Sequence, residues 1–144
     1  MTEKVVIAGA GHAAGQLVAS LKQQKFAGQI VLVGDEPYLP YQRPPLSKKF
    51  LSGDMPAERL YVKPTSFYDD PRIELRLETQ ITEIDRDSKT LKTDSGNIAY
   101  DTLILALGSR VRHLPVEGAD LDGVYYLRSI ADVDGIHAEL QHKK

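Results

Sequence analysis

Cysteine is absent from the 144 residues of the sequence. A chain without thiols forms no disulfide and holds no iron–sulfur cluster, thiolate-bound zinc or redox-active dithiol. Any electron transfer that involves these residues therefore proceeds without a sulfur relay. We also expect no metal site, because the four histidines lie in unrelated segments without the spacing of metal ligands, at His12, His113, His137 and His142.

A surplus of charge and a long apolar run are lacking as well. The sequence has 18 Lys and Arg residues against 20 Asp and Glu residues, a net charge of −2. This balance favours neither a nucleic acid nor an anionic membrane as a partner. No apolar stretch has the length of a membrane span, and Met1–Gly11 lacks the basic start and long apolar core of a signal peptide. We expect a cytoplasmic protein.

Residues 4–34 have the pattern of one βαβ unit. The apolar run Lys4–Ala8 is typical of a buried strand, and glycines end it. Apolar residues then recur at helical spacing, which predicts a helix from about His12 to Gln24. A second apolar run, Ile30–Val33, predicts another buried strand. A strand, a helix and a strand in this order imply a parallel pair of strands.

A proline-rich loop is expected at residues 37–48. Four prolines among the nine residues of Pro37–Pro45 exclude regular structure and favour a stiff, extended backbone. Beyond them the sequence predicts a short helix at Leu46–Leu51, a brief strand at Leu60–Val62 and a helical turn at Pro64–Asp69.

Two kinds of β-structure are predicted in the second half. The continuous apolar run at 102–107 suits a parallel sheet that is buried on both faces, and residues 73–77 are expected to form another strand of this sheet. Residues 79–100 instead alternate short strands with turn residues, which predicts an antiparallel meander. A further strand is expected at Val124–Leu127 and an amphipathic helix at Ile130–Leu140.

These elements together define the expected fold class. Hydrophobic residues make up 42% of the sequence and charged residues 26%, which is ordinary globular usage. We predict a single α/β domain over residues 1–144, with a Rossmann-like parallel sheet and an inserted antiparallel β-meander.

Gly9, Gly11 and Ala14 form a GxGxxA pattern between the first strand and the first helix, the context that favours a dinucleotide fingerprint. Gly9 would allow a tight turn, Gly11 would leave room for a pyrophosphate, and Ala14 would let the helix pack closely on the strand. The helix N-terminus, which begins at His12 and Ala13, would supply amide donors to the phosphates.

Asp35 and Glu36 follow the second strand of the βαβ unit. A carboxylate at this point can accept the ribose hydroxyls of an adenosine and would repel a 2′-phosphate. NAD and FAD share the adenosine diphosphate half, so these features leave the choice between them open.

Arg43 and Lys48 lie in the segment PYQRPPLSK, residues 40–48. A proline-stiffened loop with a guanidinium and an ammonium group could hold diphosphate oxygens and a flavin edge. On the residues alone, an exposed basic loop is the better explanation, because charged loop residues are usually solvated.

The segments VVIAGAGHAAG, LVGDE, PYQRPPLSK, TLILALGSRVRHLP and YLRS occur in this order around the predicted meander. Together they make the whole chain resemble the flavin-dependent NADH:ferredoxin reductases of oxygenase systems, within the pyridine nucleotide-disulphide oxidoreductase superfamily. The resemblance implies that NADH reduces FAD and that FAD passes single electrons to a 2Fe-2S ferredoxin.

The resemblance also implies residue roles. Ala13 would contact FAD, Asp35 would bind the adenosine ribose, and Arg43 would lie at the diphosphate. Lys48 would lie at the flavin ring near its reactive nitrogen, where it is the candidate catalytic residue. The backbone of Ile81 would meet the adenine. The remaining residues expected near the cofactor are Ala106, Gly108 and Arg128.

Two departures from the family pattern bear on these expectations. Ala14 stands where the third fingerprint glycine is usual, and the sequence has no second glycine fingerprint for NADH. We therefore expect that the chain alone is inactive. The resemblance also implies a later segment that adds a strand beside residues 102–107. Without that strand we expect residues 102–107 to be a sheet edge, and we expect the chain to self-associate through this edge or by exchanging its C-terminal residues. Two alternatives remain: an isolated adenine-dinucleotide-binding module or assembly subunit without turnover, and a NAD-binding Rossmann domain of another dehydrogenase.

Overall fold

The computed structural model describes residues 3–142 and divides the chain into two compact units. Unit 1 comprises Met1–Tyr41 and Tyr61–Gly108, and unit 2 comprises Gln42–Leu60 and Ser109–Lys144. Each unit is described by itself.

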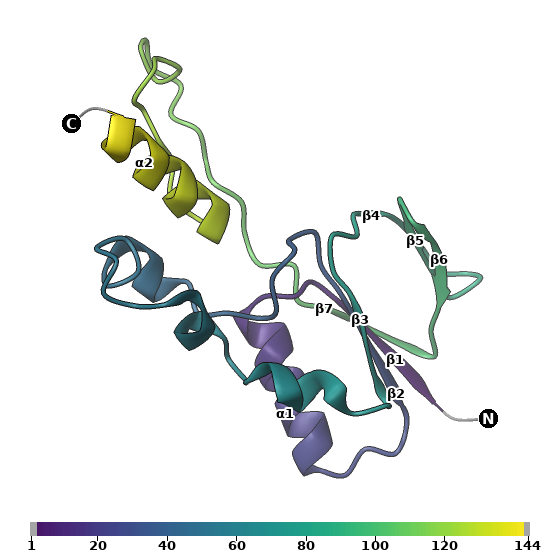
Figure 1. Cartoon of the computed structure of the whole chain (residues 1–144). Helices are drawn as coiled ribbons and strands as arrows, with labels where there is room; N and C mark the ends of the chain where they lie inside the picture. The colour runs from purple at the N-terminus through teal and green to yellow at the C-terminus, as the bar shows by residue number, and fades with distance from the viewer. Residues whose placement is uncertain (1–2, 143–144) are drawn as a thin grey trace. The chain divides into compact units, whose positions relative to one another are not determined.

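Unit 1 is built on a four-stranded parallel sheet with the strand order β3-β2-β1-β7 (Figure 1). The strands are β1 (Lys4–Ala8), β2 (Gln29–Val33), β3 (Ile73–Arg76) and β7 (Thr102–Leu105). Helix α1 (His12–Gln23) connects β1 to β2. β7 lies at an edge of this sheet, as the sequence predicts, while self-association through it stays a prediction.

A three-stranded antiparallel sheet separates β3 from β7 in the sequence. Its strands β4 (Ile81–Asp85), β5 (Thr90–Thr93) and β6 (Gly96–Ala99) pair in sequence order, so the predicted meander is confirmed.

Both faces of the parallel sheet are covered, and the alternation of side chains along β1 shows it. Val5 and Ile7 belong to a core cluster with Ala14 and Val18 of α1. Val6, on the opposite face, belongs to a second cluster that includes Leu91 and Ile98 of the meander. Because successive side chains of a strand point to opposite faces, a strand between two cores must be apolar at every position. This explains the continuous apolar runs in β1 and β2.

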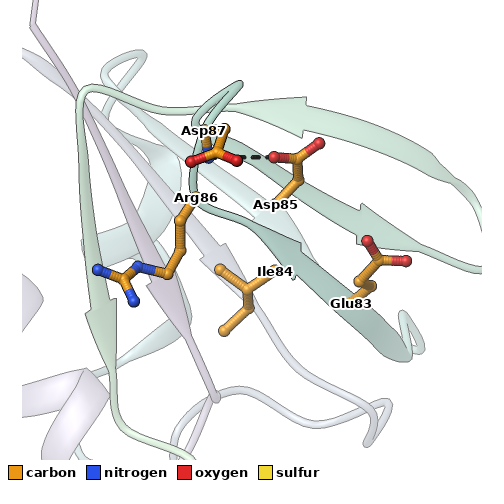
Figure 2. Close-up of a pocket in the computed structure, with 5 residues that line it drawn as sticks. All are labelled: Glu83, Ile84, Asp85, Arg86 and Asp87. Atoms are coloured by element: carbon orange, nitrogen blue, oxygen red, sulfur yellow. Dashed lines mark hydrogen bonds between the residues drawn. The ribbon is translucent and has the colours of Figure 1, made fainter.

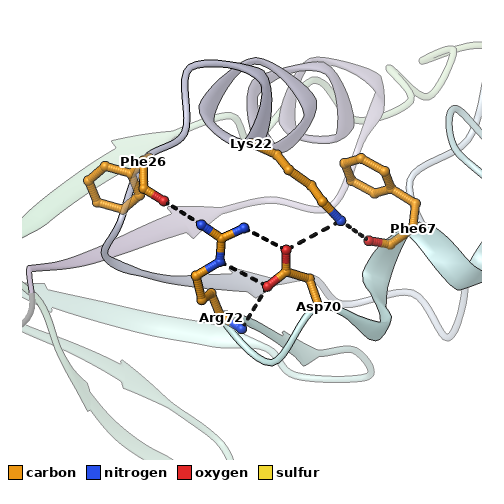
Figure 3. Close-up of polar contacts among 5 residues, drawn as sticks. All are labelled: Lys22, Phe26, Phe67, Asp70 and Arg72. Atoms are coloured by element: carbon orange, nitrogen blue, oxygen red, sulfur yellow. Dashed lines mark hydrogen bonds and ion pairs between the residues drawn. The ribbon is translucent and has the colours of Figure 1, made fainter.

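A cluster of charged side chains joins the end of α1 to the start of β3 (Figure 3). The carboxylate of Asp70 pairs with the Arg72 guanidinium at 2.7 Å and with Lys22 Nζ at 3.3 Å. Arg72 Nη1 also donates to the carbonyl of Phe26 at 2.9 Å, and Lys22 Nζ donates to that of Phe67 at 3.0 Å. Hydrogen bonds from Arg72 hold the pKa of Asp70 well below its usual value.

Unit 2 has little regular structure besides helix α2 (Ile130–His142). Two short 3₁₀ helices, η1 (Pro44–Ser47) and η2 (Ala57–Leu60), lie in its first segment, whereas η3 (Thr65–Asp69) belongs to unit 1. A ring nitrogen of His137 on α2 hydrogen-bonds the carbonyl of Leu51 at 2.7 Å, so α2 is tied to the turn that follows η1. The buried apolar residues of this unit are Leu46, Leu60, Ile130 and Val133.

Three predicted elements are wrong. Residues 46–51 form no α-helix, because Pro44 and Pro45 begin a 3₁₀ helix that ends at Ser47. Residues 60–62 form no strand, because Leu60 ends η2 and Tyr61 makes only an isolated bridge with Tyr41. Residues 124–127 form no strand, since no strand of the described chain pairs with them. The predicted α/β fold class, by contrast, is confirmed.

Candidate dinucleotide-binding site

The predicted binding residues of unit 1 gather at the carboxyl ends of its parallel strands. Gly9 follows β1, Asp35 follows β2, and Ala106 follows β7. Two backbone hydrogen bonds hold these ends together, from Gly9 N to the carbonyl of Val33 and from Ala106 N to that of Ala8, each 2.7 Å long. In open α/β sheets, ligands bind beside the carboxyl ends of the parallel strands.

Gly9 makes the close approach on which this edge depends. Its φ angle is +109°, and a Cβ atom at this position would lie 2.3 Å from the carbonyl oxygen of Ala106. Both the backbone conformation and the contact exclude any larger residue. The tight turn predicted at Gly9 is thus needed to bring β1 and the end of β7 into contact.

Gly11 lies in a different environment, although it is only two residues away. It is the N-cap of α1 with a φ of −85°, and a Cβ atom here would have no neighbour within 4 Å. No side chain caps the helix, and its first turn contains no acidic residue. His12 and Ala13 are exposed, whereas Ala14 is buried. The start of α1 therefore offers amide donors and open space, the two features that a pyrophosphate requires.

Asp35 and Glu36 have different surroundings. The side chain of Asp35 is exposed, just beyond the buried residue Gly34. Glu36 is half-buried, and its Oε2 accepts a hydrogen bond of 2.5 Å from the hydroxyl of Tyr41, a residue that is only 2% exposed. The exposed carboxylate is available to a ligand, while the other is engaged in fixing the start of the proline-rich loop.

Ile81, Ala106 and Gly108 are the remaining predicted residues of unit 1. The amide of Thr79 donates to the carbonyl of Gly34 at 2.9 Å, which holds the segment leading to Ile81 beside the end of β2. Ile81 itself is half-buried against the core beneath the meander. Gly108 is exposed with a φ of +66°.

The predicted residues of unit 2 are Arg43, Lys48 and Arg128. Arg43 Nη1 donates to the carbonyl of Arg128 at 2.7 Å, so the structure brings these two arginines together. Arg128 also donates from Nε to the carbonyl of Ser109 at 3.2 Å. Lys48 ends η1, and its side chain is exposed.

A surface hollow at the turn between β4 and β5 does not qualify as a ligand site. One continuous segment, residues 83–87, lines it (Figure 2). Asp85 in this segment accepts hydrogen bonds from the amides of Asp87 at 3.1 Å and Ser88 at 3.0 Å, which shape the turn. All of its lining residues come from this one segment, so no second element of the described chain contributes a residue to a ligand site there.

Two further structural findings concern other kinds of site. Within residues 3–142, no group of His, Asp and Glu side chains could hold a metal ion. No helix in this range is long and apolar enough to span a bilayer.

Two residues near the predicted ones were not foreseen. Tyr41 could not be connected with Glu36 from the sequence, because the contact depends on the path of the proline-rich loop. Asp132 could have been found, since Ser129 and Asp132 have the S-x-x-D spacing that marks a helix N-terminus.

Comparison with known proteins agrees with this arrangement. Residues 3–144 match the family model of the pyridine nucleotide-disulphide oxidoreductases, and the chain belongs to this family. Rhodocoxin reductase of Rhodococcus erythropolis is 44% identical over 137 residues, which cover 94% of this chain and 32% of that protein. The chain thus spans about a third of the length of such curated relatives.

Solved structures give the same result. A ferredoxin reductase from Rhodopseudomonas palustris is 41% identical, with a TM-score of 0.88 over 98% of this chain and 35% of that one. The reductase in a covalent putidaredoxin reductase–putidaredoxin complex is 38% identical, with a TM-score of 0.85 over 96% of this chain and 34% of that one. The matched family consists of oxidoreductases, and the relatives are named as reductases.

Proposed function

We propose that the chain is the FAD-binding portion of a reductase that passes electrons from NADH through FAD to a 2Fe-2S ferredoxin. The observation that carries the proposal is the arrangement of Gly9, Gly11 and Asp35 beyond the carboxyl ends of β1 and β2. The names of the similar proteins support the two electron partners, since one is a ferredoxin–NAD(P)⁺ reductase and another a rubredoxin–NAD⁺ reductase.

The residues of unit 1 fit the adenosine diphosphate half of FAD. The open space at Gly11 and the uncapped amides of α1 suit the diphosphate. The exposed Asp35 carboxylate suits the ribose hydroxyls and would repel a 2′-phosphate. We propose that Glu36, predicted to share this role, instead holds Tyr41 through the hydrogen bond to its hydroxyl.

The roles of Arg43, Lys48 and Arg128 at the diphosphate and the flavin remain proposals that the family resemblance supports. When bound, the flavin accepts a hydride and releases single electrons. A cation held near the flavin ring stabilises negative charge that develops there, and the exposed ammonium group of Lys48 can supply one.

The family name includes disulphide chemistry, but this chain has no cysteine, and this limits which groups could accept electrons from a flavin. No thiol of this chain can accept electrons from a flavin. Transfer from the flavin directly to an iron–sulfur protein is the reaction that these residues leave open.

The test is a titration of the purified chain with FAD, followed by flavin fluorescence and visible absorbance. We expect saturable quenching and a shifted flavin spectrum. Equal binding of NAD and FAD would favour a NAD-binding Rossmann domain instead. Failure to bind either dinucleotide would contradict the proposed function.

A further inference from the structure

One aspartate of unit 2, Asp132, bonds the backbone of Arg128, and Arg128 and Arg43 are two residues that the family resemblance assigns to FAD. The backbone of Arg128 is held at both of its polar groups: its carbonyl accepts from Arg43 Nη1 at 2.7 Å, and its amide donates to Asp132 Oδ2 at 2.8 Å. The Arg128 side chain is tied separately, through Nε, to the carbonyl of Ser109. Arg43, Arg128 and Asp132 thus belong to one hydrogen-bonded network.

Asp132 lies in the first turn of α2 and also serves the N-terminus of that helix. Its Oδ2 accepts from the Ser129 amide at 2.7 Å and from the Ser129 hydroxyl at 2.8 Å. The Asp132 amide in turn lies 3.3 Å from Ser129 Oγ. This is the reciprocal arrangement of a capping box, with Asp in the place of the usual Glu.

The charge of Asp132 has a use beyond capping. Burial opposes its ionisation, but the hydrogen bonds from Ser129 and Arg128 and the positive charge of Arg43 outweigh burial and lower its pKa. The carboxylate holds the Arg128 amide while Arg43 holds the Arg128 carbonyl, so the backbone from which the Arg128 side chain extends is fixed on both sides. Side chains that are already oriented lose less conformational entropy when a ligand binds.

We propose that Asp132 is a positioning residue, which holds Arg43 and Arg128 in the orientation that binds FAD. This inference rests on the proposed function. It assigns a task to a residue outside the glycine fingerprint and the proline-rich loop. Asp132 acts through the arginines and does not itself contact the cofactor.

The first experiment compares FAD affinity and melting temperature in three variants of the chain. Asp132→Ala removes the anchor, and Ser129→Ala weakens the cap but keeps the bond between Asp132 and the Arg128 amide. Asp134→Ala is the matched control, because Asp134 is an exposed carboxylate two residues further along α2.

We expect Asp132→Ala to weaken FAD binding about tenfold, the loss of one charge-assisted interaction. Ser129→Ala should lower the melting temperature yet change FAD affinity less than about twofold. Asp134→Ala should leave both unchanged, and Asp132→Glu should restore most of the affinity because Glu completes a capping box. Equal losses of affinity in Asp132→Ala and Ser129→Ala would reduce Asp132 to a helix cap and overturn the proposal.

The second experiment does not require FAD. In ¹⁵N NMR spectra of the chain, the Nε–H signal of Arg128 should be protected from exchange in the wild type and in Ser129→Ala, and should broaden in Asp132→Ala. Unchanged arginine signals in Asp132→Ala would overturn the positioning role. If the wild type shows the expected Arg128 signal and Asp132→Ala its broadening, but the wild type binds no FAD, that result would instead contradict the proposed function.

Discussion

The candidate binding groups are mainly backbone groups in unit 1 and side chains in unit 2. Unit 1 presents backbone amides, open space beside Gly11 and one exposed carboxylate, all placed by the regular βαβ unit. Unit 2 presents long cationic side chains that hydrogen bonds across its loops hold in place. A binding site made of backbone groups should lose affinity when a glycine gains a side chain. A binding site made of side chains should lose affinity when one polar contact is removed.

The largest effect is expected at Gly9, with Gly11 as the contrast. Gly9→Ala forces a Cβ atom against the carbonyl of Ala106 at a positive φ, which should cost about 3 kcal/mol or more. Gly11→Ala meets no atom within 4 Å and should cost at most about 1 kcal/mol. Its methyl group would still occupy the space proposed for the diphosphate and weaken FAD binding at least about tenfold. Urea denaturation and FAD titration measure the two quantities, and equal stability of both variants would contradict this distinction.

The next effect separates the two adjacent carboxylates of unit 1. Asp35→Ala should weaken binding of ADP about tenfold, since it removes a charged acceptor for the ribose hydroxyls. Glu36→Ala should change ADP affinity less than about threefold but lower stability by about 1 kcal/mol, because the Tyr41 hydroxyl loses this acceptor. Calorimetric titration with ADP and thermal melts would show it. A larger loss of ADP affinity in Glu36→Ala would reverse the assignment.

The charged cluster of unit 1 should make stability depend on acid. The pKa of Asp70 is lower in the folded chain than its ordinary value of 3.8. The ionised carboxylate therefore contributes fully to the free energy of unfolding above pH 3.8, and this contribution is lost as the pH falls below that value. Asp70→Asn should therefore melt at a lower temperature at pH 7 and lose less stability than the wild type between about pH 4 and pH 2. An equal fall in the melting temperature of both proteins across that pH range would refute this role of Asp70.

The smallest effect is expected at Tyr68. Its hydroxyl is buried without a hydrogen-bond partner in the described chain, and burial raises its pKa to about 12. Tyr68→Phe removes the unpaired hydroxyl and keeps the ring in the core, so stability should stay within about 0.5 kcal/mol or rise slightly. A loss above about 1 kcal/mol in urea denaturation would show that the hydroxyl has a partner that contributes to stability.

The same contrast explains how far the sequence could predict the molecule. In unit 1, β1, α1 and β2 follow the sequence pattern because cores on both faces of the sheet dictate residue type. In unit 2, the hydrogen bonds from Arg43 to Arg128 and from His137 to Leu51 join residues 85 and 86 positions apart. No local periodicity encodes such contacts. The helix expected at 46–51 fails for a local reason, because Pro44 and Pro45 begin a 3₁₀ helix, and residues 124–127 find no strand to pair with in the described part of the chain.

Preference among dinucleotides tests the central claim most directly. Wild-type chain titrated under identical conditions with FAD, NAD and NADP should bind FAD most tightly and NADP least, because Asp35 repels the 2′-phosphate. The visible flavin spectrum would report FAD, and calorimetry would report all three ligands. Tighter binding of NADP than of FAD or NAD would contradict both the ribose role of Asp35 and the proposed flavin function.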